Sequence, residues 1–225
     1  MLASLSSAQK FRLTGRERWR LKKWYSVVAP DYFGSVAIAT TPADEPWKLL
    51  GRRVTVTLYD LTGDVTQVHV NLHFQIWKVE GENAYTIFKG HELARDYIRS
   101  LTRRKSSKVA AIFSVTTKDG YSFRVMVMAW TTYRCNTSQR HAIRKTLMDL
   151  ATKIASEKTL GEFVVGMVFG DYNQALFNDA KKIYPLRKVE FAKSKLLAVP
   201  TPEGVKKAVI IPKPGVLEAP YGTSL

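Results

Sequence analysis

The chain has 225 residues, with 35 Lys and Arg against 19 Asp and Glu and a formal net charge of +16. Because 45% of the residues are hydrophobic, the composition excludes a disordered basic tail and predicts a folded core. The single cysteine, Cys135, excludes an internal disulfide and a Cys-rich zinc site, and no apolar run approaches the roughly 18 residues of a membrane span. A folded chain this basic predicts a polyanionic partner, nucleic acid first, because Lys and Arg release the counterions condensed on phosphates.

The first 23 residues predict a basic arm that like charges keep extended until it binds RNA. Its cations are Lys10, Arg12, Arg16, Arg18, Arg20, Lys22 and Lys23. A mitochondrial transit peptide has a similar Ser-bearing, basic composition, but the basic clusters further along the chain favour an arm that binds RNA. The aromatic residues of this region either stack on bases or fill the core, and the sequence leaves both interpretations open.

The next part of the chain predicts strands. The expected elements are an ordered start at Trp24, a turn at 29–34, a short helix within 42–51 capped by Asp44, and strands at 53–58, 68–77 and 84–88. The strand at 68–77 is the clearest, because apolar and polar residues alternate along it. Its predicted buried face carries Val68, Val70, Leu72, Phe74 and Ile76, and its outer face carries His69, Asn71, His73, Gln75 and Trp77.

The remaining elements are mostly helical. They are a helix at 91–101, strands at 109–116 and 123–132 joined by an Asp-Gly turn, helices at 137–156, 160–169 and 172–182, and a strand at 186–197. The helix at 91–101 is expected to bury Leu93, Tyr97, Ile98 and Leu101. Asn136 and Gln139 predict a capping box for the first of the later helices. Five prolines from Pro200 onward predict no regular element after residue 198.

Together these elements predict an α+β fold. A curved antiparallel sheet or partial β-barrel is followed by C-terminal helices, and the last strand is expected to return to the sheet. The predicted organisation is a basic RNA-binding arm at 1–23, a single α+β domain at 24–198 and a Pro-rich extended tail at 199–225.

The residues that bear chemistry do not predict a catalytic site. The chain lacks the P-loop, dinucleotide-binding and HExxH motifs. His69 and His73 on one strand would lie about 13 Å apart, too far to share a metal ion. Asp60 and Asp64 either bind a metal or hold a turn, and the turn is the commoner arrangement. We therefore predict no catalytic residue, metal or cofactor, although a nuclease would use Asp60, Asp64 and Asp119 as its carboxylates.

Basic residues, in contrast, recur in clusters beyond the arm. They gather in the loop at 103–108, at Arg134 and 140–145 around the start of the helix at 137, and at 181–195 around the last strand. The residues predicted there to bind phosphates are Arg103, Arg104, Lys105, Lys108, Arg134, Arg140, Arg144, Lys145, Arg187 and Lys188. One basic run is usually a solvated face, but several in a folded chain with this net charge favour phosphate binding.

Six blocks of residues, in this order and at these spacings, resemble a known family. They are KKWY at 22–25 with AP at 29–30 and YF at 32–33, TLYDLTGD at 57–64, FKGHELARDY at 88–97, TTKDGY at 116–121 with Arg124, TSQ at 137–139 with IRK at 143–145, and IYPLRKV at 183–189. Over residues 10–198 the chain resembles the small-subunit ribosomal proteins of the S-three-A family, also called the eukaryote-type S-one. The short, acid-poor form is similar to the archaeal members, and the tail after Pro200 matches no block.

The resemblance implies a structural protein of the small ribosomal subunit, in the cytoplasm within the ribosome, and not an enzyme. It implies a place on the platform near the mRNA exit. The implied partners are small-subunit rRNA and neighbouring platform proteins, with the S-eleven family among them, and contacts with mRNA or initiation factors are a further expectation. The residues themselves leave one alternative open, a free-standing RNA-binding factor that is not stably part of the ribosome.

Overall fold

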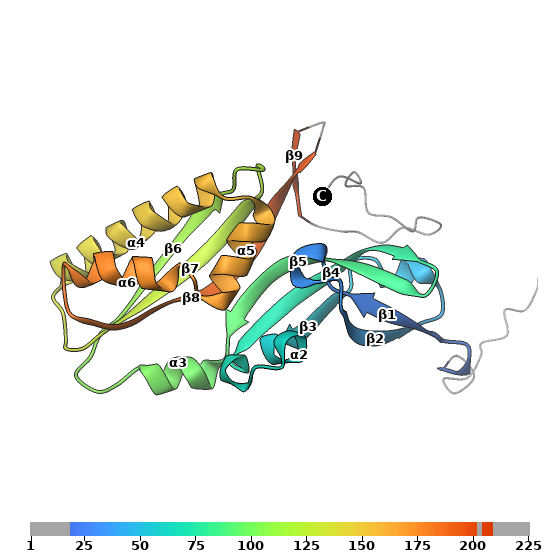
Figure 1. Ribbon diagram of the computed structural model, residues 1–225, viewed down its shortest axis with the longest axis horizontal. Helices are drawn as coiled ribbons and strands as arrows, with labels where there is room; N and C mark the ends of the chain where they lie inside the picture. Colours follow the sequence, from blue (N-terminus) through green and yellow to red (C-terminus); the bar gives the residue numbers. More distant parts are fainter. Residues whose placement is uncertain (1–18, 202–203, 209–225) are drawn as a thin grey trace, which may run out of the picture.

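The computed structural model describes residues 19–201 and 204–208, which form two halves of one elongated molecule (Figure 1). The predicted arm cations Lys10, Arg12, Arg16 and Arg18, and the tail after Ala208, lie outside these residues. The N-terminal half contains β1 (Lys23–Val28), β2 (Ala37–Ala43), β3 (Arg53–Thr57), β4 (Val70–Glu80) and β5 (Asn83–Leu93), with α2 (Leu58–Thr62) and short 3-10 helices at Asp31–Phe33, Pro46–Leu49 and Val65–Gln67.

The C-terminal half combines strands with helices. It contains β6 (Lys108–Thr116), β7 (Ser122–Thr131), β8 (Leu186–Thr201) and β9 (Gly204–Lys207), together with α4 (Thr137–Glu157), α5 (Leu160–Phe169) and α6 (Asn173–Lys181). Helix α3 (Arg95–Leu101) connects the two halves. Helix α4 packs on β6 and α6 packs on β8, so the helices cover one face of this part of the sheet (Figure 1).

All nine described strands belong to one sheet, with β2-β1-β5-β8-β7-β6 as its main path. Strands β3 and β4 extend it beside β5, and β9 pairs with β8. The predicted α+β class is confirmed, but the predicted topology needs a correction. The sheet is open, and it is mixed rather than antiparallel throughout, because β1 runs parallel to β5 while the other pairs are antiparallel.

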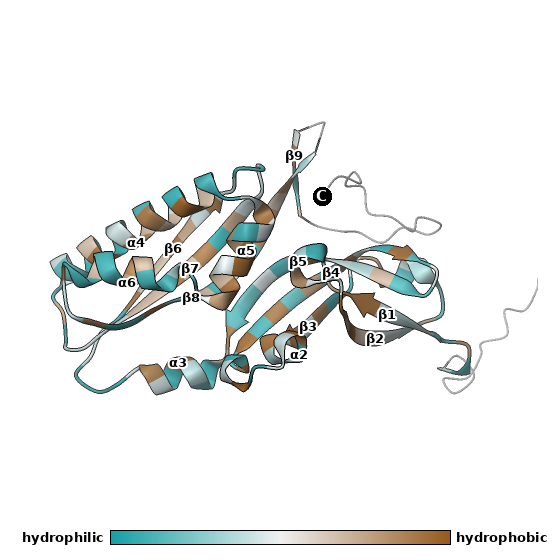
Figure 2. Ribbon diagram, viewed as in Figure 1, coloured by the Kyte–Doolittle hydropathy of each residue, from teal (hydrophilic) through white to brown (hydrophobic). Residues whose placement is uncertain are grey.

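The alternation along β4 places the core as predicted. Val70, Leu72, Phe74 and Ile76 are all buried, and Figure 2 shows hydrophobic residues alternating with hydrophilic ones along the strands. The prediction fails for Val68, which precedes the strand and is 47% exposed. His69 also precedes β4, because the chain turns through the 3-10 helix at Val65–Gln67 first.

The two halves meet where β5 approaches β8. The two strands pair only at Glu92 and Lys193, and a side chain at Gly90 would collide with the backbone oxygen of Ser194. Gly90 also has a φ of +154°, which side-chain-bearing residues rarely adopt. The close approach of these strands therefore depends on a glycine at this position.

His91 ties the same two strands together with three hydrogen bonds. Its backbone N–H donates to Ser194 Oγ at 3.0 Å, and the Ser194 hydroxyl donates to His91 Nδ1 at 2.7 Å. Its Nε2–H donates to the carbonyl of Phe191 at 2.9 Å. Because the ring is fully buried, burial lowers the pKa of His91 to about 4, and the imidazole is neutral at pH 7.

Three sequence predictions about elements were wrong. The helix expected at 91–101 begins at Arg95, because 91–93 complete β5 and bury Leu93 in the sheet. The short helix expected within 42–51 is a 3-10 helix at Pro46–Leu49, but Asp44 does not cap it, because β2 runs to Ala43 and the N-cap position falls on Glu45. The chain after residue 198 is not irregular throughout, because β8 continues to Thr201 and pairs with β9.

The later helices agree with the sequence prediction. Helix α4 begins with the predicted capping box of Asn136 and Gln139, and it buries Ile143 and Leu147. Helix α5 spans Leu160–Phe169 as predicted, and Gly170 ends it in the left-handed conformation. These boundaries follow local chemistry, which explains why the sequence located them.

Candidate nucleic-acid interface

Four cations from four strands meet where the two halves join. Arg53 opens β3, Lys89 lies in β5, Lys195 lies in β8 and Lys207 ends β9. All four line one cavity of about 450 Å³, together with Gln75 and apolar residues. No carboxylate is among the described residues that line it. We refer to these four cations as the junction cluster.

Lys89 is the least exposed member of the junction cluster. Strand β4 pairs with Phe88 and Gly90 but skips Lys89, so a bulge leaves the lysine without an opposite residue. Only 8% of Lys89 is exposed, and its ammonium group donates a hydrogen bond to the carbonyl of Ala208. The fold thus directs a buried cation into the cavity.

The electrostatics of the junction cluster favour an anion. Burial, together with the positive charges of Arg53 and Lys195, lowers the pKa of Lys89 from 10.5 to about 8. The group stays mostly protonated at neutral pH, so several like charges share a small volume. A bound anion would relieve this repulsion. Its oxygens, like those of a phosphate, would accept charge-assisted hydrogen bonds from the cations.

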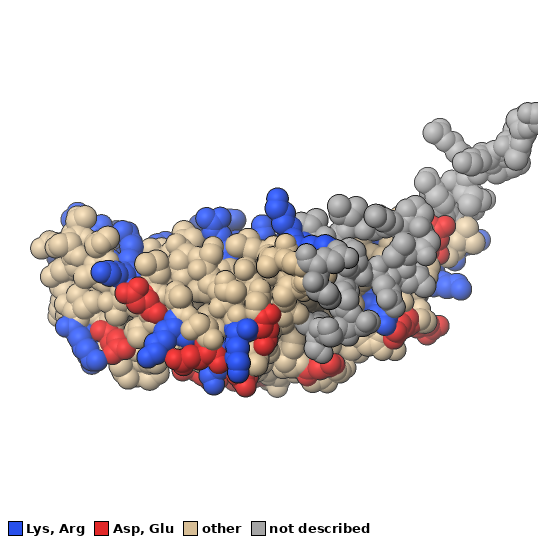
Figure 3. Space-filling model, turned by 90° about the horizontal axis from the view of Figure 1, so that it is seen from above, with Lys and Arg blue, Asp and Glu red and all other residues tan. Residues whose placement is uncertain are grey.

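The basic surface continues from the junction cluster across the C-terminal half. Arg124 lies opposite Lys195 on the neighbouring strand, and both are exposed. Phe123 packs against Phe163 of α5, so strand alternation directs Arg124 to the face without helices. Figure 3 shows Lys and Arg along the upper edge of its view with few Asp or Glu among them, whereas acidic and basic residues are mixed toward the lower edge.

Three of the predicted basic segments come together at the end of the molecule far from β1 (Figure 1). Ser107 joins the loop at 103–108 to the start of α4, because its Oγ accepts a hydrogen bond from the N–H of Cys135 at 3.2 Å. Tyr184 donates to the carbonyl of Arg134 at 3.1 Å, which brings the start of β8 alongside. The exposed cations gathered there, which we name the distal basic end, are Arg103, Arg104, Lys105, Lys108, Arg134 and Arg187.

Three other predicted residues make bonds within the fold. The guanidinium group of Arg140 donates two hydrogen bonds, of 3.2 and 3.0 Å, to the carbonyl of Cys135. Arg144 donates through Nε to the carbonyl of Ala110 in β6 at 3.2 Å. Lys188 forms an ion pair of 2.6 Å with the buried Glu190. These cations therefore connect elements of the fold, whatever else they contact.

The other predicted cations lie elsewhere on the surface. Lys145 is exposed on α4, two turns after its start. Arg20, Lys22 and Lys23 precede or begin β1 at the opposite end of the molecule from the distal basic end (Figure 1). The ammonium group of Lys22 lies 4.5 Å from the centre of the Trp19 ring. The structure therefore separates the predicted residues into several surfaces.

The carboxylates considered for catalysis hold turns and helix ends. Asp60 forms a capping box with Thr57 at the start of α2, and Asp64 accepts a hydrogen bond from the N–H of Thr66 at 3.0 Å. Asp119 accepts from the N–H of Leu160 at 2.7 Å, at the first residue of α5. The turn interpretation of Asp60 and Asp64 is confirmed. The described residues contain no group of three or more His, Cys, Asp or Glu that could hold a metal ion.

No sequence pattern predicted the junction cluster. Its members lie in four separate strands, and although Lys195 belongs to the basic cluster at 181–195, nothing in the sequence places it beside Arg53, Lys89 and Lys207. One local signal was available, since Lys89 directly follows the apolar pair Ile87 and Phe88 and precedes Gly90. In the described parts of the chain, no helix has the length and apolar character needed to cross a membrane.

Comparison with known proteins identifies the family. The Ribosomal S3Ae family matches residues 12–200. The chain is 56% identical over 201 residues to small ribosomal subunit protein eS1 of Ignicoccus hospitalis, covering 88% of this chain and 95% of that protein. The protein of the same name in Staphylothermus marinus is 57% identical over 196 residues, covering 87% of this chain and 92% of that protein. The one in Aeropyrum pernix is 58% identical over 200 residues, covering 87% of this chain and 94% of that protein. The resemblance predicted from the six blocks is confirmed, and the chain belongs to the ribosomal S3Ae family.

Proposed function

We propose that this chain is a structural constituent of the small ribosomal subunit and that its junction cluster grips phosphates of the small-subunit rRNA. The family supports the first part, because its members are ribosomal structural proteins and not enzymes. The single observation that carries the second part is the meeting of Arg53, Lys89, Lys195 and Lys207 around one cavity whose described lining has no carboxylate.

The junction cluster binds phosphate through complementary chemistry. A guanidinium group such as that of Arg53 can donate two parallel hydrogen bonds to a phosphate, and each ammonium group adds a point charge. RNA binding releases counterions, and it offsets the repulsion among the cations of the free protein. Contacts of this kind fix the position of the RNA backbone without reading its sequence, so recognition rests on the shape of the RNA.

The distal basic end binds a second segment of the same RNA. It lies on the C-terminal half, away from the region where the two halves join (Figure 1). Arg20, Lys22 and Lys23 supply a third group of cations before β1. Basic surfaces spread along an elongated molecule suit a protein that bridges separate RNA segments and stabilises their arrangement.

The finer position within the ribosome follows from the family resemblance. We expect the protein on the platform of the small subunit in the cytoplasmic ribosome, near the mRNA exit. Neighbouring platform proteins, the S-eleven family among them, are the expected protein partners, and mRNA or initiation factors are expected nearby. Cross-linking of purified subunits followed by mass spectrometry would identify these neighbours directly.

Sedimentation of a native lysate through sucrose gradients at low and high salt tests the ribosomal assignment. We expect the protein to migrate with the small subunit and to stay there at moderate salt. Migration as a free species, or complete loss from the subunit at modest salt, would instead support the free-standing RNA-binding factor.

Paired charge variants test the role of the junction cluster. In the variant Arg53→Gln/Lys195→Gln we expect affinity for small-subunit rRNA to fall about tenfold or more. The slope of the logarithm of the binding constant against the logarithm of salt concentration should become shallower by the equivalent of about two phosphate contacts. The matched control is Lys153→Gln/Lys181→Gln, which removes the same charge from the exposed surfaces of α4 and α6. Equal losses in the two variants would mean that only net charge matters, and would refute the proposed site.

A further inference from the structure

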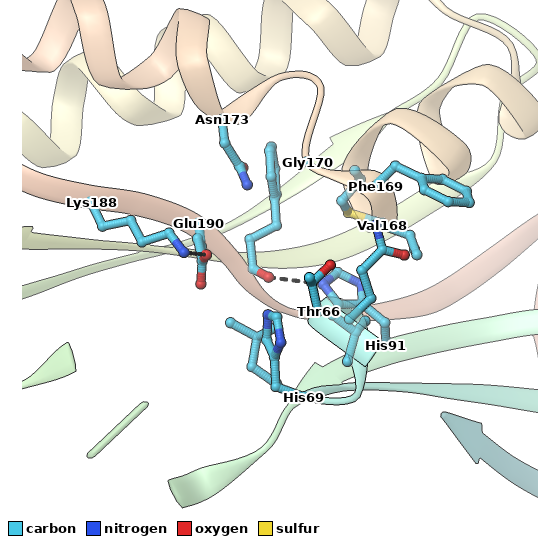
Figure 4. Close-up of a pocket in the computed structure, with 14 residues that line it drawn as sticks. Thr66, His69, His91, Val168, Phe169, Gly170, Asn173, Lys188 and Glu190 are labelled. Carbon is cyan, nitrogen blue, oxygen red and sulfur yellow. Dashed lines mark hydrogen bonds and ion pairs between the residues drawn. The ribbon is translucent and has the colours of Figure 1, made fainter. Parts of the chain in front are cut away.

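A second cavity, of about 350 Å³, is framed by the segment before β4, by β8 and by the turn between α5 and α6. Its apolar lining residues are Val70, Leu93, Met167, Val168, Phe169 and Phe191. Polar side chains enter from several elements, and Figure 4 shows Asn173, Glu190 and His69 directed toward its centre. Neither the family nor the proposed phosphate contacts account for it.

Three residues that line this cavity each have one side-chain oxygen that is buried without a hydrogen-bond partner among the described residues. These oxygens are Gln67 Oε1, Asn173 Oδ1 and Glu190 Oε2. A buried polar atom left unpaired costs about 1–3 kcal/mol, and such atoms are rare in folded proteins. Three of them around one cavity indicate a ligand that supplies hydrogen-bond donors.

Glu190 is held in place on one side and unpaired on the other. Only 6% of the residue is exposed. Its Oε1 accepts a hydrogen bond of 2.8 Å from the hydroxyl of Tyr97 and lies 2.6 Å from the ammonium group of Lys188. The ring of Tyr97 in turn stacks on His69, with 3.8 Å between the ring centres. The orientation of Glu190 Oε2 at the cavity is thus fixed before any ligand binds.

The charge and size of the cavity favour a neutral organic ligand over a metal ion. Lys188 balances the charge of Glu190, and burial lowers the pKa of both His69 and His91, so the lining carries no net charge at pH 7. The volume falls within the range of about 300–1,000 Å³ that is typical of small-molecule sites. It is about tenfold the roughly 30 Å³ of one water molecule, so a single ion would leave most of it unfilled.

We infer that this cavity, the base pocket, receives an unpaired rRNA base that carries an exocyclic amino group, which means adenine, cytosine or guanine. One such amino group donates to two of the three acceptors, and a ribose hydroxyl can donate to the third. Phe169, which lines the pocket and is 40% exposed, offers a ring on which the base stacks. The inference rests on the proposed binding of rRNA, because the RNA supplies the base.

Cytidine and uridine are a matched pair of probes, because they differ at one position where cytidine has an amino group and uridine has an oxygen. Neither carries a phosphate, so the junction cluster does not contribute to their binding. In saturation-transfer NMR with the full chain, we expect cytidine to bind at least about fivefold more tightly than uridine. Equal binding of the two nucleosides, or tighter binding of methylguanidine as a probe for a partner's arginine, would overturn the inference.

Variants of the pocket give a signature that a purely structural role would not produce. Asn173→Leu and Gln67→Leu each remove an unpaired buried oxygen, so we expect the melting temperature of the free protein to rise while cytidine binding is lost. The variant Arg53→Gln/Lys195→Gln should lose affinity for rRNA but keep its affinity for cytidine. Failure of the base pocket and failure of the phosphate site are therefore distinguishable. Unchanged cytidine binding in both leucine variants would refute the pocket.

Cross-linking in assembled subunits identifies the natural occupant. A benzophenone amino acid at position 169 should attach to the rRNA at one nucleotide, and that nucleotide should be adenosine, cytidine or guanosine. Attachment to a protein alone, or to a uridine, would overturn the inference.

Discussion

The junction cluster and the distal basic end are both basic surfaces, but they are built differently. The cations of the distal basic end are exposed, and most of them are close neighbours in the sequence. Those of the junction cluster come from four strands of both halves and include the buried Lys89. The first surface needs only a run of basic residues, whereas the second exists only when the two halves are joined.

This difference indicates which of the two basic surfaces is stabilised more by a bound anion. The exposed cations of the distal basic end are solvated, so their repulsion costs little and their contacts with RNA are weak and screened by salt. In the junction cluster Arg53, Lys195 and Lys207 are exposed as well, but Lys89 is buried and has lost most of its hydration, which a bound anion would replace. We therefore expect perturbation of the junction to have much larger effects than equal perturbation of the distal basic end.

The largest effect is expected from Gly90→Ala. The added methyl group would meet the backbone of Ser194, so β5 and β8 must move apart. We expect a loss of about 3 kcal/mol or more in the free energy of unfolding, measured by urea denaturation. The control is Gly81→Ala, since Gly81 also has a positive φ but no atom within 4 Å of the added carbon, and it should cost about 1 kcal/mol. Similar losses at both sites would contradict the close approach.

Acidification should weaken the same junction through His91. Burial lowers the pKa of His91 in the folded chain to about 4. As the pH falls, the same side chain in the unfolded chain therefore binds a proton first, near pH 6.5. Stability that is present above pH 6.5 is therefore lost as the pH falls, by up to about 1.4 kcal/mol per pH unit down to about pH 4. Urea denaturation between pH 4 and 7 measures the slope.

The variant His91→Asn isolates this contribution. His69 and His73 also have lowered pKa values, so they add to the slope in the same direction. The difference in the free energy of unfolding between the native protein and the variant should nevertheless retain most of the dependence on pH. If both proteins lost stability equally on acidification, the buried imidazole would not be the cause.

Lys89→Met should separate stability from binding. Methionine has a similar shape to lysine but no charge. Replacing the buried charge in this way should leave the free protein as stable as before, or more stable by about 1 kcal/mol. Affinity for rRNA should nevertheless fall about tenfold, which filter binding at fixed salt would measure. A less stable protein with unchanged affinity would show that Lys89 serves the fold and not the RNA.

The smallest effect is expected at the distal basic end. Arg103→Gln/Arg104→Gln should change the free energy of unfolding by less than about 0.5 kcal/mol, because both side chains are exposed. Affinity for rRNA should fall only about threefold at low salt, and less as salt is raised. A loss larger than that of Lys89→Met would reverse the ranking of the two surfaces.

Local patterns accounted for much of the fold. Alternation located β4, the capping box located the start of α4, and Gly170 marked the end of α5. The predictions failed where tertiary contacts override local preference. Residues 91–93 have helix-compatible spacing, but His91 is drawn into β5 by its hydrogen bonds with Ser194 and Phe191. Pro200 lies in β8 although proline disfavours strands, because the strand continues to Thr201 and pairs with β9.

The sequence by itself determined the basic character of this protein, its fold class, its family and the cations of the distal basic end. Each of these depends on composition or on residues that are close together in the chain. Only the tertiary structure decided the junction cluster and the base pocket, because each gathers residues from both halves of the molecule. The physical reason is that repulsion among converging cations and the desolvation of acceptor oxygens depend on distance and burial, which a linear sequence does not contain.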